Sequence, residues 1–326
     1  MKTKIISFAF LGLSLCSFGN KTSPQFSLEE KGAMPAGDEI VNGVSSDPDS
    51  RINAIADNGK FIWIGTNKGL LRINKKSKQS TSFNKANSPL PSDYVTAICC
   101  GENGNVWIGT SNGILRYDNF TFILINSENS GLPDNHITSL VVDSKKNLWI
   151  GTFFGGLVQA AGNNHFRVFN HLNAPMAIDC IFSLSADSKG NVWAGIFLNG
   201  LLKVSDASLE MFDASNSGLS EKNISFVQEH AHGKYIVGTN EGFFYEFDGK
   251  NFLEVNRPLV SKDIRSASVI EKTGQVLVLC VEGISVLKKT STEDGEEGLF
   301  YNNIASLLVS RYLKPAQNSG LLTNQK

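Results

Sequence analysis

Short runs of apolar residues recur along the chain with a period of about 42 residues. The clearest run contains a tryptophan and is spelled FIWIGT at 61–66, NVWIGT at 105–110, NLWIGT at 147–152 and NVWAGI at 191–196. All four tryptophans of the protein lie in these strings. Tryptophan is rare and bulky, so its placement at one phase of the pattern identifies a repeat protein.

A second apolar anchor precedes each of these runs and extends the pattern toward the C-terminus. Its positions are Ile52, Val95, Ile137, Ile181, Ile224, Ile264 and Ile304. In the fifth and sixth repeats the tryptophan position is occupied by Ile236 and Leu277. The sequence therefore predicts six complete repeats and the beginning of a seventh.

Each repeat has the pattern of four short strands separated by turns. In the third repeat the strands are expected at 136–143, 148–152, 157–161 and 165–170. Asp57, Asp143 and Asp187 recur at the turn after the first strand, where aspartate bonds the local backbone. The period within a strand is two, which excludes helical repeats, and the first strand is apolar on both faces. An all-β propeller of four-stranded blades, with every first strand covered on both sides, satisfies this pattern.

A glycine follows the tryptophan position in five repeats, at Gly65, Gly109, Gly151, Gly195 and Gly238. Glycine inside a strand often marks the close approach of another segment, here expected to be a bulky residue of the neighbouring blade. Trp149 and its equivalents are then expected to fill the wedge between blades. They are interpreted as core residues rather than as platforms for a ligand.

The two ends of the chain are expected to close the ring together. The seventh first strand would come from residues 303–310, and its partners from short strands within residues 20–51. Closure by both termini favours seven blades over six. The propeller repeats then occupy residues 52–313, and residues 314–326 form a flexible tail.

Residues 1–19 have the features of a secretory signal peptide. Two lysines precede an apolar segment at 5–16, and small residues follow before Asn20. Cleavage there would leave a periplasmic or secreted protein. The alternative is a lipoprotein anchored through Cys16, although Leu15 stands where a lipidation motif has a small residue. No later apolar segment is long enough to span a membrane.

Composition limits the chemistry further. The formal net charge of -1 argues against a nucleic-acid partner. Four cysteines follow the signal segment without the spacing of a metal or redox site, and they are expected to be small buried residues: Cys99, Cys100, Cys180 and Cys280. His230 and His232 have the spacing of zinc ligands on a strand, but without a third ligand an exposed hairpin is the simpler interpretation. No cofactor or metal is therefore expected.

The segment GLPDNHITSLVVDSKKNLWIGTFFGGL resembles the two-component regulator propeller repeat, which has a GLP start, an acidic turn, LWIGT and GL-x-RYD. The chain also has GLLRIN at 69–74 and GILRYD at 113–118. The resemblance extends from residue 52 to about residue 310 and is strongest in repeats one to four.

This resemblance carries expectations about function. Well-known members of the family are periplasmic sensor regions of Bacteroidetes-type hybrid histidine kinases, which respond to glycan fragments. Those receptors continue into an immunoglobulin-like domain, a membrane helix and a kinase, and none of these parts is expected within the 326 residues. The resemblance therefore implies an exported propeller, and phosphotransfer is not carried over.

The strand directions place two kinds of loop on one face, which we call the top face. These are the loops that enter each first strand and the turns between second and third strands. Most of the turns are polar, but those of repeats three and four are apolar and one residue longer, with Phe153 and Phe154, and Phe197 and Leu198. Neighbouring loops supply further candidates for a ligand site: Tyr94, Asp134, Asn135, His136 and Asp179. Clustered apolar surface residues indicate binding, and the alternative is local packing over the blades.

Three hypotheses about function follow. The first is a non-enzymatic exported propeller that binds a small molecule, a glycan fragment or an envelope protein on its top face, as a sensor or an accessory to signalling. The second is a propeller enzyme of lyase type, for which His136 is the only histidine expected on that face. The third is an inert scaffold in a cell-envelope complex. The sequence contains no G-x-S-x-G, HExxH or phosphate-binding loop, which favours the first hypothesis.

Overall fold

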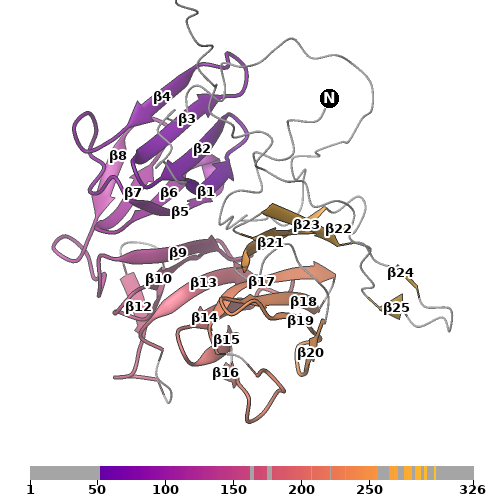
Figure 1. Ribbon diagram of the computed structural model, residues 1–326. Coiled ribbons are helices and arrows are strands. Elements are labelled where there is room, and N and C mark those ends of the chain that lie inside the picture. Colours follow the sequence, from indigo (N-terminus) through magenta and orange to yellow (C-terminus); the bar gives the residue numbers. More distant parts are fainter. Residues whose placement is uncertain are drawn as a thin grey trace, which may run out of the picture.

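The structure, a computed structural model, describes residues 52–161, 165–174, 178–206, 208–220, 222–231 and 233–255, and the backbone of strand segments between 264 and 298 (Figure 1). Within these residues the chain forms five four-stranded antiparallel sheets, each from four strands that are consecutive in sequence. A sixth sheet contains three strands, and a short two-stranded ribbon follows it. The predicted all-β fold and the four-strand repeat are therefore confirmed.

We call the sheets blades 1 to 6 in chain order. Blade 1 contains β1 (Ile52–Asp57), β2 (Phe61–Thr66), β3 (Gly69–Asn74) and β4 (Ser80–Phe83). Blade 2 contains β5 (Val95–Cys100), β6 (Val106–Thr110), β7 (Gly113–Tyr117) and β8 (Phe122–Ile125), with a short 3-10 turn η2 (Glu102–Gly104). Blade 3 contains β9 (Ile137–Val142), β10 (Leu148–Thr152), β11 (Leu157–Ala161) and β12 (His165–Phe169).

The remaining blades follow the same order. Blade 4 contains β13 (Ile181–Ala186), β14 (Val192–Ile196), β15 (Gly200–Val204) and β16 (Leu209–Phe212). Blade 5 contains β17 (Ile224–Ala231), β18 (Lys234–Thr239), β19 (Phe244–Phe247) and β20 (Phe252–Glu254). Blade 6 contains β21 (Ile264–Ile270), β22 (Gln275–Cys280) and β23 (Gly283–Leu287), and the ribbon contains β24 (Thr290–Ser291) and β25 (Glu297–Gly298).

The first strands of consecutive blades pack side by side, from β1 and β5 through to β17 and β21. The second strand of each of the first five blades also contacts the first strand of the next. The first strands are therefore innermost, as a propeller requires, and the later strands point outward (Figure 1). The described strands form an open series. The predicted closure into seven blades involves residues 20–51 and 303–313, which lie outside the described residues, and it stays a prediction.

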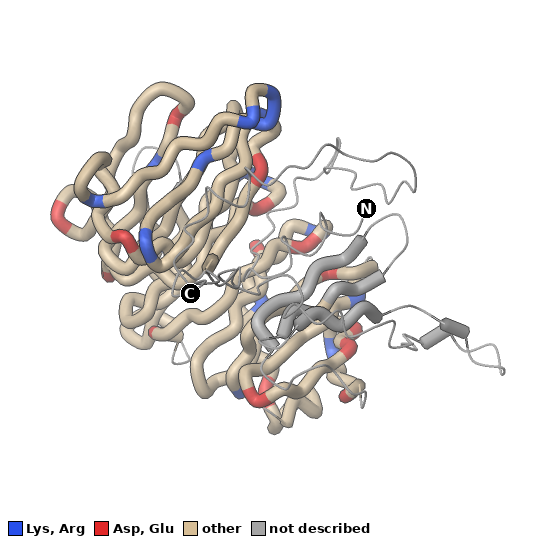
Figure 2. The backbone as a smooth tube through the Cα atoms, turned by 45° about the horizontal axis from the view of Figure 1, so that its top comes forward, with Lys and Arg blue, Asp and Glu red and all other residues tan. Residues whose placement is uncertain are grey.

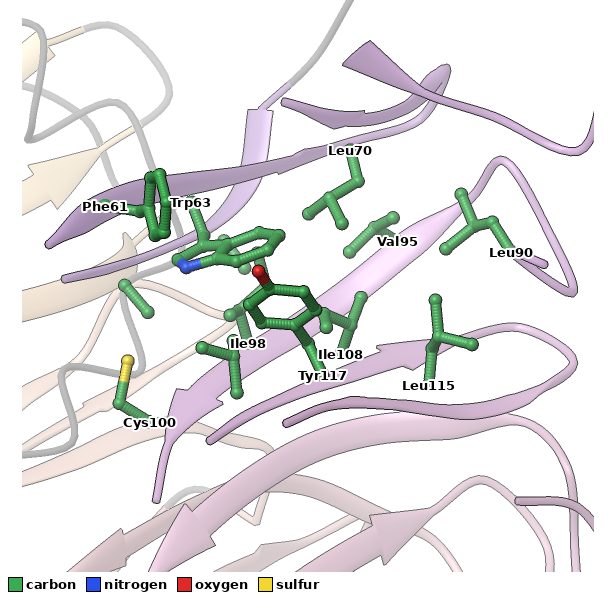
Figure 3. Packing of buried hydrophobic residues seen from close by; sticks show 13 residues of the cluster. Phe61, Trp63, Leu70, Leu90, Val95, Ile98, Cys100, Ile108, Leu115 and Tyr117 are labelled. Carbon is green, nitrogen blue, oxygen red and sulfur yellow. The ribbon is translucent and has the colours of Figure 1, made fainter. Parts of the chain in front are cut away.

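Trp63 is fully buried between blades 1 and 2, and Figure 3 shows its indole ring among side chains from both sheets. Val95 and Ile98 come from the first strand of blade 2, and Tyr117 from its third, with the two ring centroids of Trp63 and Tyr117 5.0 Å apart. Trp149 belongs to a buried cluster that spans blades 3 and 4 in the same way. The prediction that these tryptophans are core residues between blades is confirmed for Trp63, Trp149 and Trp193, whereas Trp107 is partly buried and packs against the cluster between blades 2 and 3.

The strand glycines lie where the next blade approaches most closely. A β-carbon on Gly109 would lie 2.7 Å from Ile137 Cγ2, and one on Gly151 would lie 2.7 Å from Ile181 Cγ2. Gly65 and Gly195 are crowded by Val95 and Ile224 in the same manner. These four contacts confirm the predicted approach of the neighbouring blade. Gly238 differs, because the residue against it is Phe226 of its own blade.

At the other end of blades 3 and 4, aspartate holds the first turn and the tryptophan together. Asp143 accepts hydrogen bonds from the amides of Lys145 and Asn147, and its Oδ2 accepts one from Trp149 Nε1 at 2.8 Å. Asp187 repeats this arrangement with Trp193 Nε1 at 2.9 Å. Both aspartates are buried, so these bonds offset the cost of removing a carboxylate from water. Their predicted role in the turn is confirmed.

Asp187 also ties two blades together. Its Oδ2 accepts a hydrogen bond from the Tyr235 hydroxyl of β18 at 2.7 Å. Burial raises the pKa of Asp187, but hydrogen bonds from Asn191, Tyr235 and Trp193 outweigh burial and hold this pKa below its usual value. Burial and the adjacent Asp187 carboxylate raise the pKa of Tyr235, so its hydroxyl stays protonated and continues to donate.

Charged residues of the described chain are spread over the loops and strands rather than gathered on one face (Figure 2). No helix in the described residues has the length and apolar character needed to cross a membrane.

The substitution Gly109→Ala tests the contact between blades. The added methyl group would meet Ile137 at 2.7 Å, so blades 2 and 3 must shift apart. We expect the free energy of unfolding to fall by about 1–3 kcal/mol, measured by urea denaturation. Gly131→Ala is the control, because its methyl group would meet Phe166 at an ordinary 3.4 Å. Equal stability of the two variants would contradict the constraint.

The substitution Asp187→Asn tests the tie between blades 4 and 5. The folded pKa of Asp187 is lowered, so the carboxylate stabilises the fold above its unfolded pKa of about 4 and this stabilisation is lost as pH falls through the folded pKa. We expect a lower Tm for Asp187→Asn at neutral pH and a smaller difference from the parent in acid. Asp206→Asn, at an exposed ion pair with Lys145, should change Tm little at either pH. A pH-independent difference for Asp187→Asn would contradict this role.

Candidate functional site

Backbone hydrogen bonds hold the top-face loops of adjacent blades together. The amide of Gly113 in blade 2 donates to the carbonyl of Asn135, in the loop that enters blade 3, at 2.7 Å. Gly156 N donates to Asp179 O in the same way at 2.8 Å, and Gly200 N donates to Lys222 O at 3.0 Å. The turns between second and third strands therefore lie beside the loops that enter the next blade. The predicted sharing of one face by these two kinds of loop is confirmed.

The loops of blades 3 and 4 expose large apolar side chains on this face. Phe154 is 74% exposed, Phe197 44% and Leu198 57%. Leu172, in the loop between blades 3 and 4, is 79% exposed and was missed by the sequence reasoning. We call Phe154, Leu172, Phe197 and Leu198 the apolar crest. Their exposure argues against the alternative of local packing over the blades.

Blade 3 supplies the first half of the site from its entry loop and its apolar turn. Phe153 is half-buried and stacks on His136, with ring centroids 5.0 Å apart, and Phe154 meets the Phe153 ring edge-on at 4.6 Å. Asp134 fixes both segments, because Oδ1 accepts a hydrogen bond from His136 N at 3.0 Å and Oδ2 accepts one from Phe154 N at 2.8 Å. Phe154 is thus held by its backbone while its ring remains exposed.

Blade 4 supplies the second half. Phe197 packs on Phe182 of β13 with ring centroids 5.0 Å apart, and Phe197 N donates to Cys180 O at 3.0 Å. Leu198 has a φ of 56°, and its amide donates to Asn223 Oδ1 at 3.0 Å. Asn223 is held in turn, because its Nδ2 donates to Glu241 Oε1 at 2.6 Å. The exposed tip of this turn is therefore anchored by the loop that enters blade 5.

Asp179 and Cys180 lie at the seam between these two halves. Asp179 Oδ1 lies 2.8 Å from His171 Nδ1, which places a second histidine on the top face and corrects the expectation that His136 is the only one there. Burial raises the pKa of Asp179, but the hydrogen bonds and charge of His171 outweigh it and lower this pKa. Burial raises the pKa of the Cys180 thiol, and the charges of Asp134 and Asp179 raise it further, so the thiol stays protonated.

Two of the predicted site residues have other surroundings. Tyr94 is 49% exposed but belongs to the loop between blades 1 and 2, where its carbonyl accepts the amide of Ser111. Asn135 shapes its own loop, because its Oδ1 accepts Ser127 N at 2.8 Å and its Nδ2 donates to Ser127 Oγ at 3.0 Å. The structure thus brings Phe153, Phe154, Asp134 and His136 into mutual contact, and it gives Asn135 a structural role. Phe197, Leu198 and Asp179 lie in the adjoining loops, where they contact Phe182, Asn223 and His171.

One sequence interpretation of the top turns is wrong. The turn of blade 5 was expected to be as short as those of blades 1 and 2, but Thr239 N donates to Phe243 O, which matches the longer turn of blade 3. Sequence reasoning missed the additional residue of the blade 5 turn because a glycine stands at the position where a short turn would have one. Phe243 is half-buried and stacks on Tyr245 at 6.4 Å, so it does not extend the apolar crest.

The described residues contain no group of three or more His, Cys, Asp or Glu side chains arranged to hold a metal ion. His230 lies in β17, at the opposite end of blade 5 from the top face, and His232 lies outside the described residues. The site thus combines the exposed side chains of the apolar crest with the nearby carboxylates of Asp134 and Asp179.

Comparison with known families identifies the repeat. Residues 89–112 and 131–154 match the family model described as two component regulator propeller. Each match covers a GLP or LPS loop, a first strand and the tryptophan strand that follows. The chain therefore carries two-component regulator propeller repeats, as the sequence resemblance predicted. No curated protein sequence matches the chain.

Solved structures share the fold at low sequence identity. The extracellular domain of a hybrid two-component system from B. thetaiotaomicron aligns with a TM-score of 0.61 and 18% identity, over 74% of this chain and 33% of that one. Virginiamycin B lyase from Staphylococcus aureus aligns with a TM-score of 0.61 and 12% identity, over 80% of this chain and 88% of the lyase. PorZ, a surface component of the type-IX secretion system of Porphyromonas gingivalis, aligns with a TM-score of 0.57 and 16% identity, over 73% of this chain and 38% of PorZ. The chain thus spans about a third of the extracellular domain's length.

Two substitutions separate surface from core among the aromatic residues of blade 3. Phe154→Ala removes an exposed ring and should change the free energy of unfolding by no more than about 0.5 kcal/mol. Trp149→Ala empties a buried position and leaves Asp143 without its indole donor, so we expect a loss of about 3–5 kcal/mol. Chemical denaturation of both variants gives these values. Equal destabilisation would show that Phe154 is part of the core.

Proposed function

We propose that this protein is an exported, non-enzymatic β-propeller that binds a ligand or protein partner through the apolar crest of its top face. The observation that carries the proposal is the exposure of four large apolar side chains on adjacent loops whose backbones are fixed by hydrogen bonds. An apolar surface held in one conformation loses little entropy on binding, which favours affinity.

The two-component regulator propeller repeats support a sensor-like role or a role accessory to signalling. Extracellular domains with the same fold are consistent with export through the predicted signal peptide at 1–19. Anchoring through Cys16 is the alternative route to the same compartment. The partner is then a ligand or a protein of the cell envelope, met outside the cytoplasm.

A lyase-type activity has less support from the residues at the site. Within the described residues the His136 ring stacks on Phe153 rather than facing a carboxylate, and the His171 ring is paired with Asp179 at the blade 3–4 seam. The raised pKa of Cys180 keeps its thiol protonated, which disfavours this residue as a nucleophile. The fold shared with a lyase is compatible with many functions, so it does not by itself indicate catalysis.

The proposal is tested by screening the mature chain against glycan fragments and synthetic peptides, followed by calorimetric titration of any compound that binds. Phe154→Ser and Phe197→Ser should each weaken binding at least about tenfold, because exposed aromatic anchors carry much of the energy of an interface. Phe120→Ser is the matched control, since Phe120 is 91% exposed on the turn between β7 and β8, away from the top face. Binding that responds equally to all three variants, or turnover of the bound compound, would overturn the proposal.

A further inference from the structure

Leu198 is held in a conformation that leucine rarely adopts. Its φ of 56° lies in the left-handed region, where glycine and asparagine are favoured. The other described non-glycine residues with positive φ are lysines and asparagines: Lys78, Asn103, Asn119 and Lys146. A strained, bulky and exposed residue is disfavoured by stability alone, so Leu198 indicates selection for contact with another molecule.

The surroundings of Leu198 show how the strain is maintained. Asn223 accepts the amide hydrogen of Leu198, and Glu241 accepts a hydrogen bond from Asn223. These two residues belong to blade 5, so the blade 4 turn is positioned by its neighbour rather than by its own sequence. The side chain is thereby presented to solvent next to Phe197 in a fixed orientation.

The chemistry of the apolar crest favours apolar side chains as its ligand groups. Two of its four members are leucines, which lack the flat face on which a sugar ring stacks. The phenylalanine ring of Phe154 meets Phe153 edge-on, at an interplanar angle of 88°, so the two rings do not form a continuous platform. Aliphatic and aromatic side chains of a peptide fit such an uneven surface better than a glycan does.

The seam between the two halves of the apolar crest is acidic. Asp134 and Asp179 flank Cys180 there, and Glu241 lies exposed beyond Leu198. The positive charge of nearby Lys222 interacts with Asp213. Hydrogen bonds from Ser215 are the main cause of the lowered pKa of Asp213, and the charge of Lys222 lowers this pKa further. The carboxylates of the seam already accept backbone and imidazole hydrogen bonds, but their negative charge remains available to a cation.

Given the proposed binding role of this face, the geometry points to an extended peptide segment of a protein partner that presents apolar residues and lysine or arginine in turn along one of its faces. The apolar side chains lie on Phe154, Phe197 and Leu198. The cationic side chains reach Asp134 and Asp179 in the seam between them. In an extended peptide, side chains two residues apart point to the same side, so apolar and cationic residues must take turns at every second position to place charge between two apolar contacts.

The test uses the mature full chain and three synthetic peptides followed by fluorescence anisotropy. All three peptides have serine at every second position as a spacer. Between the spacers, one peptide has leucine and lysine in turn, the second has leucine and glutamate in turn, and the third has serine and lysine in turn. We expect the leucine–lysine peptide to bind at least about tenfold more tightly than either of the others, and more weakly at high salt. Equal binding of the leucine–lysine and serine–lysine peptides, or of the two leucine peptides, would overturn the inference.

Leu198→Asn provides the decisive variant, because asparagine accepts the left-handed conformation that leucine resists. Its Tm should be equal to or above that of the parent, while binding of the leucine–lysine peptide falls at least about tenfold. Leu253→Asn is the control, since Leu253 is 68% exposed on the outer strand β20. Asp179→Asn should weaken binding of the leucine–lysine peptide, while binding of the leucine–glutamate peptide should be unchanged or tighter.

The outcomes separate this inference from the proposed function. If none of the peptides binds, but a glycan binds and Phe154→Ser abolishes glycan binding, the proposed function of the top face stands and the peptide inference is wrong. If the leucine–lysine peptide binds and neither Phe154→Ser nor Leu198→Asn changes its affinity, both are wrong. A loss of peptide binding in Leu198→Asn with unchanged or higher Tm supports both together.

Discussion

The contact between the strand glycine of one blade and the first-strand anchor of the next determines the geometry of the whole series. A β-carbon on Gly109, Gly151 or Gly195 would meet the neighbouring blade at 3.0 Å or less. Side chains two residues apart face the same side of a strand, so the tryptophan and glycine of each W-I-G-T string face the same neighbour. The gap between blades is therefore narrow at the glycine and wide at the indole, and a tryptophan fills the wide end.

The inner strands share a second feature, a β-bulge next to the anchor residue. In each of the six described first strands the pairing register shifts directly after the anchor residue, as at a β-bulge. The residues left unpaired in the register are Asn53, Thr96, Thr138, Phe182, Ser225 and Arg265. All but one of these residues are polar. The exception is Phe182, whose ring supports Phe197 in the apolar turn of blade 4. Blade 4 thus departs from the repeat both at the bulge and at the turn, and the two departures contact each other.

The strands and buried positions that repeat were predictable from sequence, whereas several residues that occur once, the bulges and the cations beside the tryptophans were not. Six versions of one strand pattern identify the blades, and the tryptophan and glycine positions follow from their phase. Leu172 and His171 escaped notice because they occupy variable positions of a repeated loop, whose Asn170, Asn173 and Asp179 correspond to Asn84, Asn87 and Asp93 in the loop that enters blade 2. The bulges were invisible, since an extra residue in a strand does not change an apolar pattern that is buried on both faces. Arg72, Arg116 and Lys203 also lay outside the prediction, although each places its cation within 6 Å of the tryptophan on the neighbouring strand.

The two ends of a blade are held together by different kinds of hydrogen bond. At the lower end, side chains hold the turns, because the carboxylates of Asp143 and Asp187 accept hydrogen bonds from turn amides and from indole nitrogens. At the top, backbone amides and carbonyls join the loops, and Asp134 and Asn223 bind the main chain of Phe154 and Leu198 rather than their side chains. Because these bonds involve the main chain, the side chains of the top turns can differ from one blade to the next. A repeat fixed by its lower turns and inner strands allows each blade to present different chemistry on the same face, and in blades 3 and 4 that chemistry is apolar.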